Sequence, residues 1–249
     1  MMAGKSNGGS IVKKISTGIE GMDKLLYGGI PENEQVILAG GPGAGKTLLS
    51  FEILYKNAKS GTPSALISFE EEPEDIIRNA KEVFSSFDDI DDLIASGKLT
   101  IEKAKSYERI YQKGDDTSNY SFGHIVSEIE NVLMKNNAKL IVIDSISVVK
   151  LLFQDIFSYR KAMMSLTQNL HRLGVTAFFT YELQTSSRKD LKFTKEFFMF
   201  DGVIILYQSQ EDDKRSLVAE VIKTRGTNHS WVLSPYEITP EGFSFMTVA

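Results

Sequence analysis

The most specific feature of this sequence is the run Gly40-Gly41-Pro42-Gly43-Ala44-Gly45-Lys46-Thr47. It matches the pattern G-x-x-x-x-G-K-[ST], in which glycines let backbone amides turn inward around a chain of phosphates. An apolar stretch, residues 35–40, precedes the run, and apolar residues at helical spacing follow it from residue 46 to residue 60. A glycine-rich turn between a strand and a helix is the context that this pattern needs, so the sequence predicts a phosphate-binding loop here.

The polar residues of this loop each have a chemical reason to be there. Lys46 carries a point charge that reaches the terminal phosphates, and the Thr47 hydroxyl is a ligand for Mg2+. The helix that follows presents its positive N-terminus to the anion. We therefore predict that ATP and Mg2+ bind here, and that the residues lining the nucleotide are Gly41, Pro42, Gly43, Ala44, Gly45, Lys46, Thr47 and Leu48.

A second phosphate-site element is the stretch Leu140-Ile141-Val142-Ile143-Asp144, an apolar strand that ends in a carboxylate. Asp144 is predicted to hold Mg2+, directly or through a water molecule. Taken alone, this pattern is weak, because any buried strand can end in Asp. Its combination with the glycine-rich loop favours the metal site.

A third element follows the strand predicted at residues 65–69. Glu70 and Glu71 stand at its end, where a carboxylate can polarise a water molecule that attacks the γ-phosphate. The alternative is that residues 70–74 form the acidic first turn of the next helix, with Pro73 fixing its start. We favour the catalytic interpretation, and the sequence does not distinguish which glutamate is the base.

Strands and helices alternate through most of the chain. Helices are predicted at residues 74–87, around 125–133 and at 162–173, and further strands at 99–103 and 175–180. The remainder changes to strands alone, at 202–207, 217–223, 231–232 and 243–246. This order predicts an α/β fold with a mostly parallel central sheet flanked by helices and an antiparallel C-terminal β extension.

The composition is that of an ordinary globular protein, with 42% hydrophobic and 24% charged residues. A formal net charge of -5 argues against a general nucleic-acid coat, which needs an excess of Lys and Arg. The sequence has no cysteine, so disulfides and thiol catalysis are excluded. Its three histidines are scattered without ligand spacing, which argues against a transition metal.

The chain is expected to form one domain over residues 11–249, preceded by a disordered lead-in over residues 1–10, which is small, polar and glycine-rich. This opening lacks the apolar centre of a signal peptide, and no later stretch is apolar for the length of a membrane span. We therefore expect a cytoplasmic protein that does not bind membranes.

Motifs along the whole chain resemble those of one family. Ahead of the phosphate-binding loop stand Ser16-Thr17-Gly18-Ile19-Glu20-Gly21-Met22-Asp23-Lys24-Leu25-Leu26 and then Gly28-Gly29-Ile30-Pro31. These stretches resemble the RecA/RadA superfamily and, within it, the KaiC-like ATPases. Phe69-Glu70-Glu71 with Pro73 is similar to the paired catalytic glutamates of KaiC, and Ile143-Asp144-Ser145 is similar to its Walker B ending. The resemblance covers residues 15–245 and implies a single RecA-like P-loop NTPase core.

Near the C-terminus, Lys223-Thr224-Arg225-Gly226-Thr227-Asn228-His229 looks like the K-x-R-G-x-x-H segment of that family, which reaches the nucleotide of a neighbouring subunit. The resemblance implies that Lys223 and Arg225 act in trans, that His229 contacts the nucleotide, and that copies assemble into a ring, often a hexamer. A positive pair is suited to stabilising charge on a transferring phosphoryl group, as an arginine finger does. The alternative is an ordinary exposed basic strand.

Two further stretches bear on the function that the resemblance implies. Residues 195–200 lack the hydroxyls that clock KaiC proteins phosphorylate in their second domain, which disfavours a clock autokinase. The stretch Thr180-Tyr181-Glu182 follows a buried strand and is placed to sense the γ-phosphate. The loop beyond it lies where RecA-type proteins place a pore-facing loop, and its basic residues are Arg188, Lys189, Lys192 and Lys195. Few aromatic residues interleave with these charges, so a solvated loop is favoured over a site for single-stranded DNA.

The leading hypothesis is an ATPase whose hydrolysis takes place at subunit interfaces and couples the nucleotide state to assembly or to a protein partner. Its catalytic residues would be Glu70, Glu71, Lys46, Lys223 and Arg225. One alternative is a nucleotide-gated regulatory module with slow turnover. Another is a recombination accessory, resembling RadA paralogues, that binds single-stranded DNA.

Overall fold

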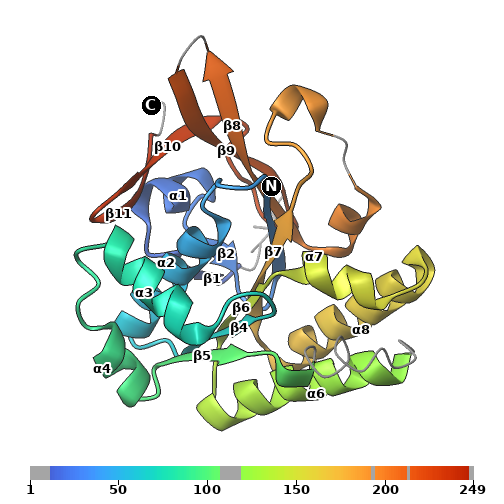
Figure 1. The fold of residues 1–249 in the computed structure, drawn as a ribbon. Coiled ribbons are helices and arrows are strands. Elements are labelled where there is room, and N and C mark those ends of the chain that lie inside the picture. The colour runs from blue at the N-terminus through green and yellow to red at the C-terminus, as the bar shows by residue number, and fades with distance from the viewer. Residues whose placement is uncertain (1–11, 107–118, 192–193, 212–213, 247–249) are drawn as a thin grey trace, which may run out of the picture.

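In the computed structural model of the protein, the described residues are 12–106, 119–191, 194–211 and 214–246. The predicted lead-in, residues 1–10, lies outside them, as do Lys192 and residues 107–118. Within the described part, nine strands form one sheet in the order β11-β10-β9-β8-β3-β7-β6-β4-β5 (Figure 1). A separate pair, β1 and β2, joins the residues that precede the phosphate-binding loop.

The sheet is parallel in one part and antiparallel in the other. All neighbours from β8 to β5 pair in parallel, and β8, β9, β10 and β11 pair antiparallel in succession. The strands are β1 Lys14–Ile15, β2 Ile30–Pro31, β3 Gln35–Gly40, β4 Ser64–Ser68, β5 Leu99–Lys103, β6 Leu140–Asp144, β7 Thr176–Glu182, β8 Gly202–Glu211, β9 Lys214–Thr224, β10 Ser234–Thr239 and β11 Gly242–Phe245. The predicted mostly parallel core with an antiparallel C-terminal extension is therefore confirmed.

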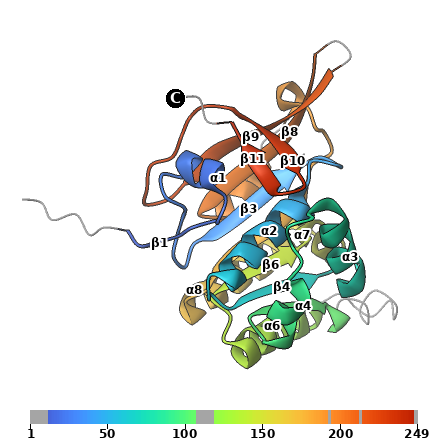
Figure 2. The ribbon, with the colours of Figure 1, turned by 90° about the vertical axis from the view of Figure 1, so that its left-hand side faces the viewer.

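Helices cover both faces of the sheet because the parallel strands are apolar on both sides. Along β3, Ile37 and Ala39 join the core beneath α6 and α8, whereas Val36 and Leu38 join the core beneath α1, α2, α3 and α4. The helices are α1 Glu20–Leu25, α2 Lys46–Lys59, α3 Pro73–Val83, α4 Ile90–Ala95, α6 Asn119–Asn136, α7 Ile146–Val149 and α8 Ile156–Leu173, and the short 3-10 helices are η1 Lys150–Leu152, η2 Arg188–Asp190 and η3 Lys195–Met199. Figure 2 shows β10 and β11 beside α1, far from α6.

Three details differ from the sequence-based expectation. The strand predicted at residues 231–232 is wrong, because Trp231 is 82% exposed and strand pairing begins only at Ser234. The helix predicted at 74–87 ends at Val83, and Phe84 turns its ring into the core. A helix that was not predicted, α4, follows, and its Ile90 and Leu93 are buried one turn apart.

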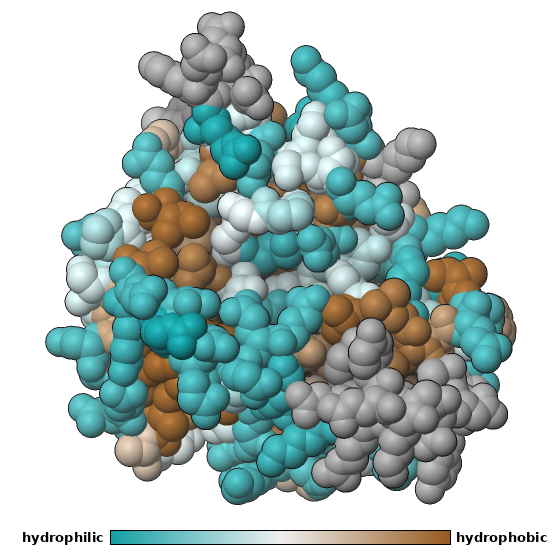
Figure 3. Space-filling view, in the orientation of Figure 1, coloured by the Kyte–Doolittle hydropathy of each residue, from teal (hydrophilic) through white to brown (hydrophobic). Residues whose placement is uncertain are grey.

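The surface is mostly polar, with apolar areas in places (Figure 3). Around the junction of α7 and α8, Leu151, Ile156 and Phe157 are exposed. Among the described residues, every helix is too short or too polar to cross a bilayer.

The C-terminal hairpin is joined to the helix that follows the phosphate-binding loop. Glu52 of α2 is buried, accepts a hydrogen bond from the Phe243 amide at 2.8 Å, and forms an ion pair with Lys56 at 2.7 Å. Gly242 approaches so closely that a Cβ there would lie 2.3 Å from Glu52 Oε1. This contact fixes the hairpin on α2.

We expect Gly242→Ala to cost about 1–3 kcal/mol more stability than Gly61→Ala. Both glycines have positive φ, 128° and 94°, so both substitutions strain the backbone, but a Cβ at Gly61 meets nothing within 4 Å. Urea unfolding of the two variants measures the difference. Equal losses would show that the contact with Glu52 yields without cost.

Candidate functional site

The phosphate-binding loop, Gly40–Thr47, connects β3 to α2 as the sequence predicts. Gly43 and Gly45 have φ of 73° and 81°, in the left-handed region that favours glycine. Gly41 is needed for a different reason, because a Cβ there would lie 2.1 Å from the Ser186 hydroxyl. The loop is thus shaped by its own left-handed turns at Gly43 and Gly45 and by the close approach of Ser186 to Gly41.

Two side chains from β8 and β10 donate hydrogen bonds to carbonyls of the loop. The Tyr236 hydroxyl of β10 donates to the Ala44 carbonyl at 2.6 Å, and the Gln208 amide of β8 donates to the Pro42 carbonyl at 2.7 Å. Both contacts join residues more than a hundred positions apart, and no local pattern in the sequence signals them. They hold two of the loop carbonyls toward the C-terminal strands, so the N–H groups of the loop can point toward a phosphate.

The order of the strands brings the candidate residues to one edge. Because β3, β7, β6 and β4 are parallel neighbours, their carboxyl ends lie side by side. The loop follows β3, Thr180 and Glu182 lie in β7, Asp144 ends β6, and Glu70 and Glu71 follow β4. This is where ligands of open α/β sheets bind.

The Asp144 carboxylate is the centre of this edge. It is buried, and its Oδ2 accepts a hydrogen bond from the Thr47 hydroxyl at 2.8 Å. Its Oδ1 accepts one from the Thr180 hydroxyl. Mg2+ prefers oxygen ligands and keeps several waters, so the adjacent Thr47 and Asp144 oxygens fit the metal that the sequence predicts.

Lys46 lies across the loop, where its Nζ donates to the Gly41 carbonyl at 3.1 Å. Burial lowers the pKa of Lys46, while the carboxylates of Glu182, Asp144 and Glu70 act in the opposite direction. One ammonium group therefore faces three carboxylates. An anionic nucleotide would need further positive charge at this edge.

Glu70 and Glu71 lie in the turn between β4 and α3. The Ser68 hydroxyl accepts hydrogen bonds from both of their amides, at 3.3 Å and 2.9 Å. Because α3 begins at Pro73, neither glutamate lies in its first turn. The acidic first turn, which was the alternative role for Glu70 and Glu71, is therefore formed by Glu74 and Asp75.

The environments of the two glutamates differ. Burial, and then the Asp144 carboxylate, raise the pKa of both. Glu71 accepts a hydrogen bond from the Asn79 amide of α3 at 3.3 Å, which acts to lower its pKa. No motif marks Asn79 in the sequence, and its one signal is an amide side chain within the first two turns of the helix that follows the glutamates.

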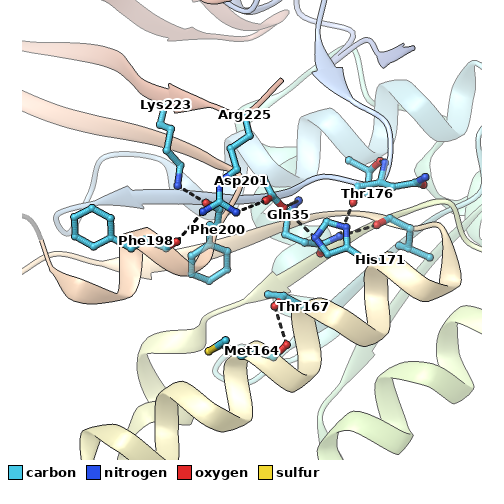
Figure 4. A network of polar contacts seen from close by, with 12 residues as sticks. Gln35, Met164, Thr167, His171, Thr176, Phe198, Phe200, Asp201, Lys223 and Arg225 are labelled. Carbon is cyan, nitrogen blue, oxygen red and sulfur yellow. Dashed lines mark hydrogen bonds and ion pairs between the residues drawn. The ribbon is translucent and has the colours of Figure 1, made fainter. Parts of the chain in front are cut away.

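Lys223, Arg225 and His229 do not join this edge within one chain. Thr224 pairs with Gly202, which pairs with Val36, so the end of β9 lies beside the start of β3, at the opposite end from the loop. Lys223 Nζ donates to the Phe200 carbonyl, and Arg225 donates to Asp201 Oδ1 at 3.0 Å (Figure 4). His229 is buried, with Nδ1 2.9 Å from the Ser230 carbonyl oxygen.

One basic residue of the loop after β7 is already bound within its own chain. The Arg188 guanidinium forms two hydrogen bonds with the Glu220 carboxylate of β9, at 2.8 and 2.9 Å. Arg188, and then the Tyr207 hydroxyl, hold the pKa of Glu220 low against its burial. This pair fastens the loop to the sheet.

The fold and the site together define a P-loop NTPase of the RecA type. The family model for the KaiC ATPase matches residues 15–248, and this chain belongs to that family. The family resemblance that the sequence showed is thereby confirmed, and ATP binding is implied by membership.

Curated relatives include the circadian clock oscillator protein KaiC of Picosynechococcus, 34% identical over 243 residues, which cover 96% of this chain and 46% of that protein. KaiC 1 of Synechocystis is 32% identical, covering 94% and 44%. The chain thus spans less than half the length of these relatives. Among solved structures, a KaiC-like protein of Pyrococcus horikoshii OT3 matches 95% of this chain and 100% of its own with a TM-score of 0.79, at 28% identity.

We expect Thr180→Val to raise the Mg2+ concentration that half-saturates ATP binding about tenfold, since outer partners of a metal ligand set its orientation. The substitution keeps the shape of the side chain and removes the donor to Asp144 Oδ1. Titration of Mg2+ against a fluorescent ATP analogue measures the shift.

Thr180→Ser should restore the parental Mg2+ requirement. Thr176→Val is the matched control, because Thr176 lies in the same strand and its hydroxyl accepts from the Asn33 amide, away from the site. A Thr180→Val protein with an unchanged Mg2+ requirement would show that Asp144 needs no support from β7.

Proposed function

We propose that this chain hydrolyses ATP with Mg2+ and that a second copy of the chain completes each site. The observation that carries this proposal is the hydrogen bond between Thr47 and Asp144 at the head of the loop, with Glu70 and Glu71 beside it. Binding alone would need the first pair of residues. The glutamates add groups that can take a proton.

In this reaction Lys46 leaves the Gly41 carbonyl and donates to the β- and γ-phosphates. Thr47 and Asp144 would hold Mg2+, which neutralises charge on the phosphates when bound. The backbone N–H groups of Gly41 and of Gly43 to Leu48 would line the phosphate chain. The loop is already held by Gln208 and Tyr236, so its N–H groups lose little orientational freedom during the reaction.

Glu71 or Glu70 acts as the base. The carboxylate accepts a proton from a water molecule while the water oxygen forms a bond to the γ-phosphorus, and the bond from that phosphorus to the β–γ bridging oxygen breaks. The raised pKa of each glutamate makes it a stronger base than an exposed carboxylate. The Asn79 contact favours Glu71, because it orients that side chain.

Lys223, Arg225 and His229 would serve the nucleotide of the next copy. Two observations support this part of the proposal: these residues lie away from their own loop, and that loop has one lysine facing three carboxylates. A head-to-tail contact closes into a ring when the rotation that relates the copies is a whole fraction of a turn, and a hexameric ring is our proposal. The nucleotide state would then control assembly or the binding of a protein partner.

The second candidate is a nucleotide-gated regulator with slow turnover, and a measurement of phosphate release distinguishes it from the ATPase. We do not propose a single-stranded DNA site, because the ion pair with Glu220 engages Arg188.

The test is steady-state phosphate release from ATP with Mg2+, with native mass recorded with and without nucleotide. We expect Lys46→Ala to lose ATP binding. Glu71→Gln and Arg225→Ala should keep binding and lose turnover by about a hundredfold or more, because a general base and an arginine finger each stabilise the transition state by at least that factor. An assembled parent that binds ATP and releases no phosphate would favour the slow regulator.

The pH dependence of turnover identifies the base. Because a raised pKa delays ionisation of the base, the rising limb of the pH–rate profile should lie above the ordinary pKa of glutamate. Asn79→Ala removes a contact that lowers the pKa of Glu71, so the limb should move further up if Glu71 is the base. A limb that stays in place in Asn79→Ala and disappears in Glu70→Gln would assign the base to Glu70.

A further inference from the structure

Arg225 is held in one orientation by its own chain. Its guanidinium donates to Asp201 Oδ1 at 3.0 Å and to the Phe198 carbonyl at 3.2 Å, and its backbone amide donates to the Asp201 carbonyl at 2.9 Å (Figure 4). The side chain is nevertheless 56% exposed. These side-chain bonds use two of the five donors of a guanidinium, so Arg225 is oriented and also open to a partner.

Asp201 is itself fixed. Its side chain is only 9% exposed. Its Oδ2 accepts a hydrogen bond from the backbone N–H of Gln35 at 3.1 Å and lies 3.1 Å from Nε2 of His171 in α8. The Asp201 amide donates to the Gln35 carbonyl at 2.8 Å. Because these partners come from β3 and α8, two elements of the core hold the carboxylate in place.

Glu34 adds a second carboxyl group to this cluster, because it directly precedes Gln35, whose backbone N–H binds Asp201. The Glu34 Oε2 atom is buried without a hydrogen-bond partner among the described residues. Burial, and then Asp201, raise the pKa of Glu34 to about 7, against the opposing effect of Arg225 and Lys223. Glu34 therefore changes charge near neutral pH. The charged and titratable groups around it are Asp201 before β8, Lys223 and Arg225 at the end of β9, and His171 of α8.

We propose that Asp201 is the positioning residue that holds Arg225 ready for the nucleotide of a neighbouring copy, and that an ionised Glu34 weakens this positioning by competing with Asp201 for the arginine. The inference rests on the proposed action of Arg225 in trans. An exposed arginine would have to give up its rotamer freedom on reaching a phosphate, whereas Asp201 has already restricted it.

The charge of Glu34 gives this arrangement a direction with pH. When Glu34 is protonated, Asp201 is the single carboxylate of the pair that attracts Arg225 and Lys223. When Glu34 is ionised, a second carboxylate competes with Asp201 for them, and Arg225 is drawn away from the orientation that Asp201 fixes. The contribution of the basic pair to turnover should therefore fall as pH rises through about 7.

The first test is Asp201→Asn, with kcat and KM measured at a protein concentration that keeps the parent assembled. An Asn side chain still accepts from the Gln35 amide but lacks the charge that orients Arg225. We expect kcat to fall on the order of tenfold, with KM for ATP nearly unchanged, because misorientation affects the transition state. Asp89→Asn, which removes the partner of Lys59 far from the cluster, should keep the parental kcat.

The second test compares the parent with Glu34→Gln from about pH 6 to about pH 8. Glu34→Gln keeps a neutral side chain at every pH, so the ratio of parental to variant kcat should fall through about pH 7. Thermal unfolding recorded at the same pH values separates this effect from a change in stability. A ratio that stays flat overturns the role of Glu34. Because this test leaves Asp201 unchanged, it can be made even if Asp201→Asn does not fold.

Arg225→Ala distinguishes this inference from the proposed function. If Arg225→Ala loses turnover while Asp201→Asn keeps the parental kcat, the positioning role is overturned and the interfacial ATPase stands. If Arg225→Ala keeps its turnover, the action in trans fails, and the role of Asp201 fails with it.

Discussion

The carboxylate of Asp144 joins two hydroxyls that come from distant parts of the sequence, and the rest of the site is arranged around it. Thr47 begins the helix after the phosphate-binding loop, and Thr180 lies in the strand between that loop and Asp144. Both bonds require β3, β7 and β6 to be parallel neighbours whose ends coincide. A sheet in any other order would leave a buried carboxylate without donors, which costs about 1–3 kcal/mol or more.

Much of the architecture could be predicted because it depends on local patterns. The apolar runs 35–40 and 140–144 coincide with β3 and β6, and the glycines of the loop take the left-handed conformations that the motif implies. The errors occur where tertiary contacts override local preference. Trp231 has a strong strand preference but lies exposed, whereas β10 contains Pro235, which sequence reasoning reads against a strand.

The candidate site could be predicted only in part, for a related reason. Lys46, Thr47, Asp144 and the glutamates each follow a recognisable strand or motif, so their shared edge follows from the order of the fold. The supporting residues have no such signal. Tyr236 and Ala44 are separated by 192 positions, and only the folded sheet shows that a phenol at the C-terminus supports a carbonyl of the loop.

The same support has a consequence for how the protein is made. On the ribosome, the P-loop and all the parallel strands leave the exit tunnel before β10 and β11. Until β10 and β11 emerge, Ala44 lacks the Tyr236 hydroxyl and Glu52 lacks the Phe243 amide. A nascent chain would thus carry the complete motif before the loop has these supports, and its ability to hold a nucleotide would arise only after β10 and β11 have left the tunnel.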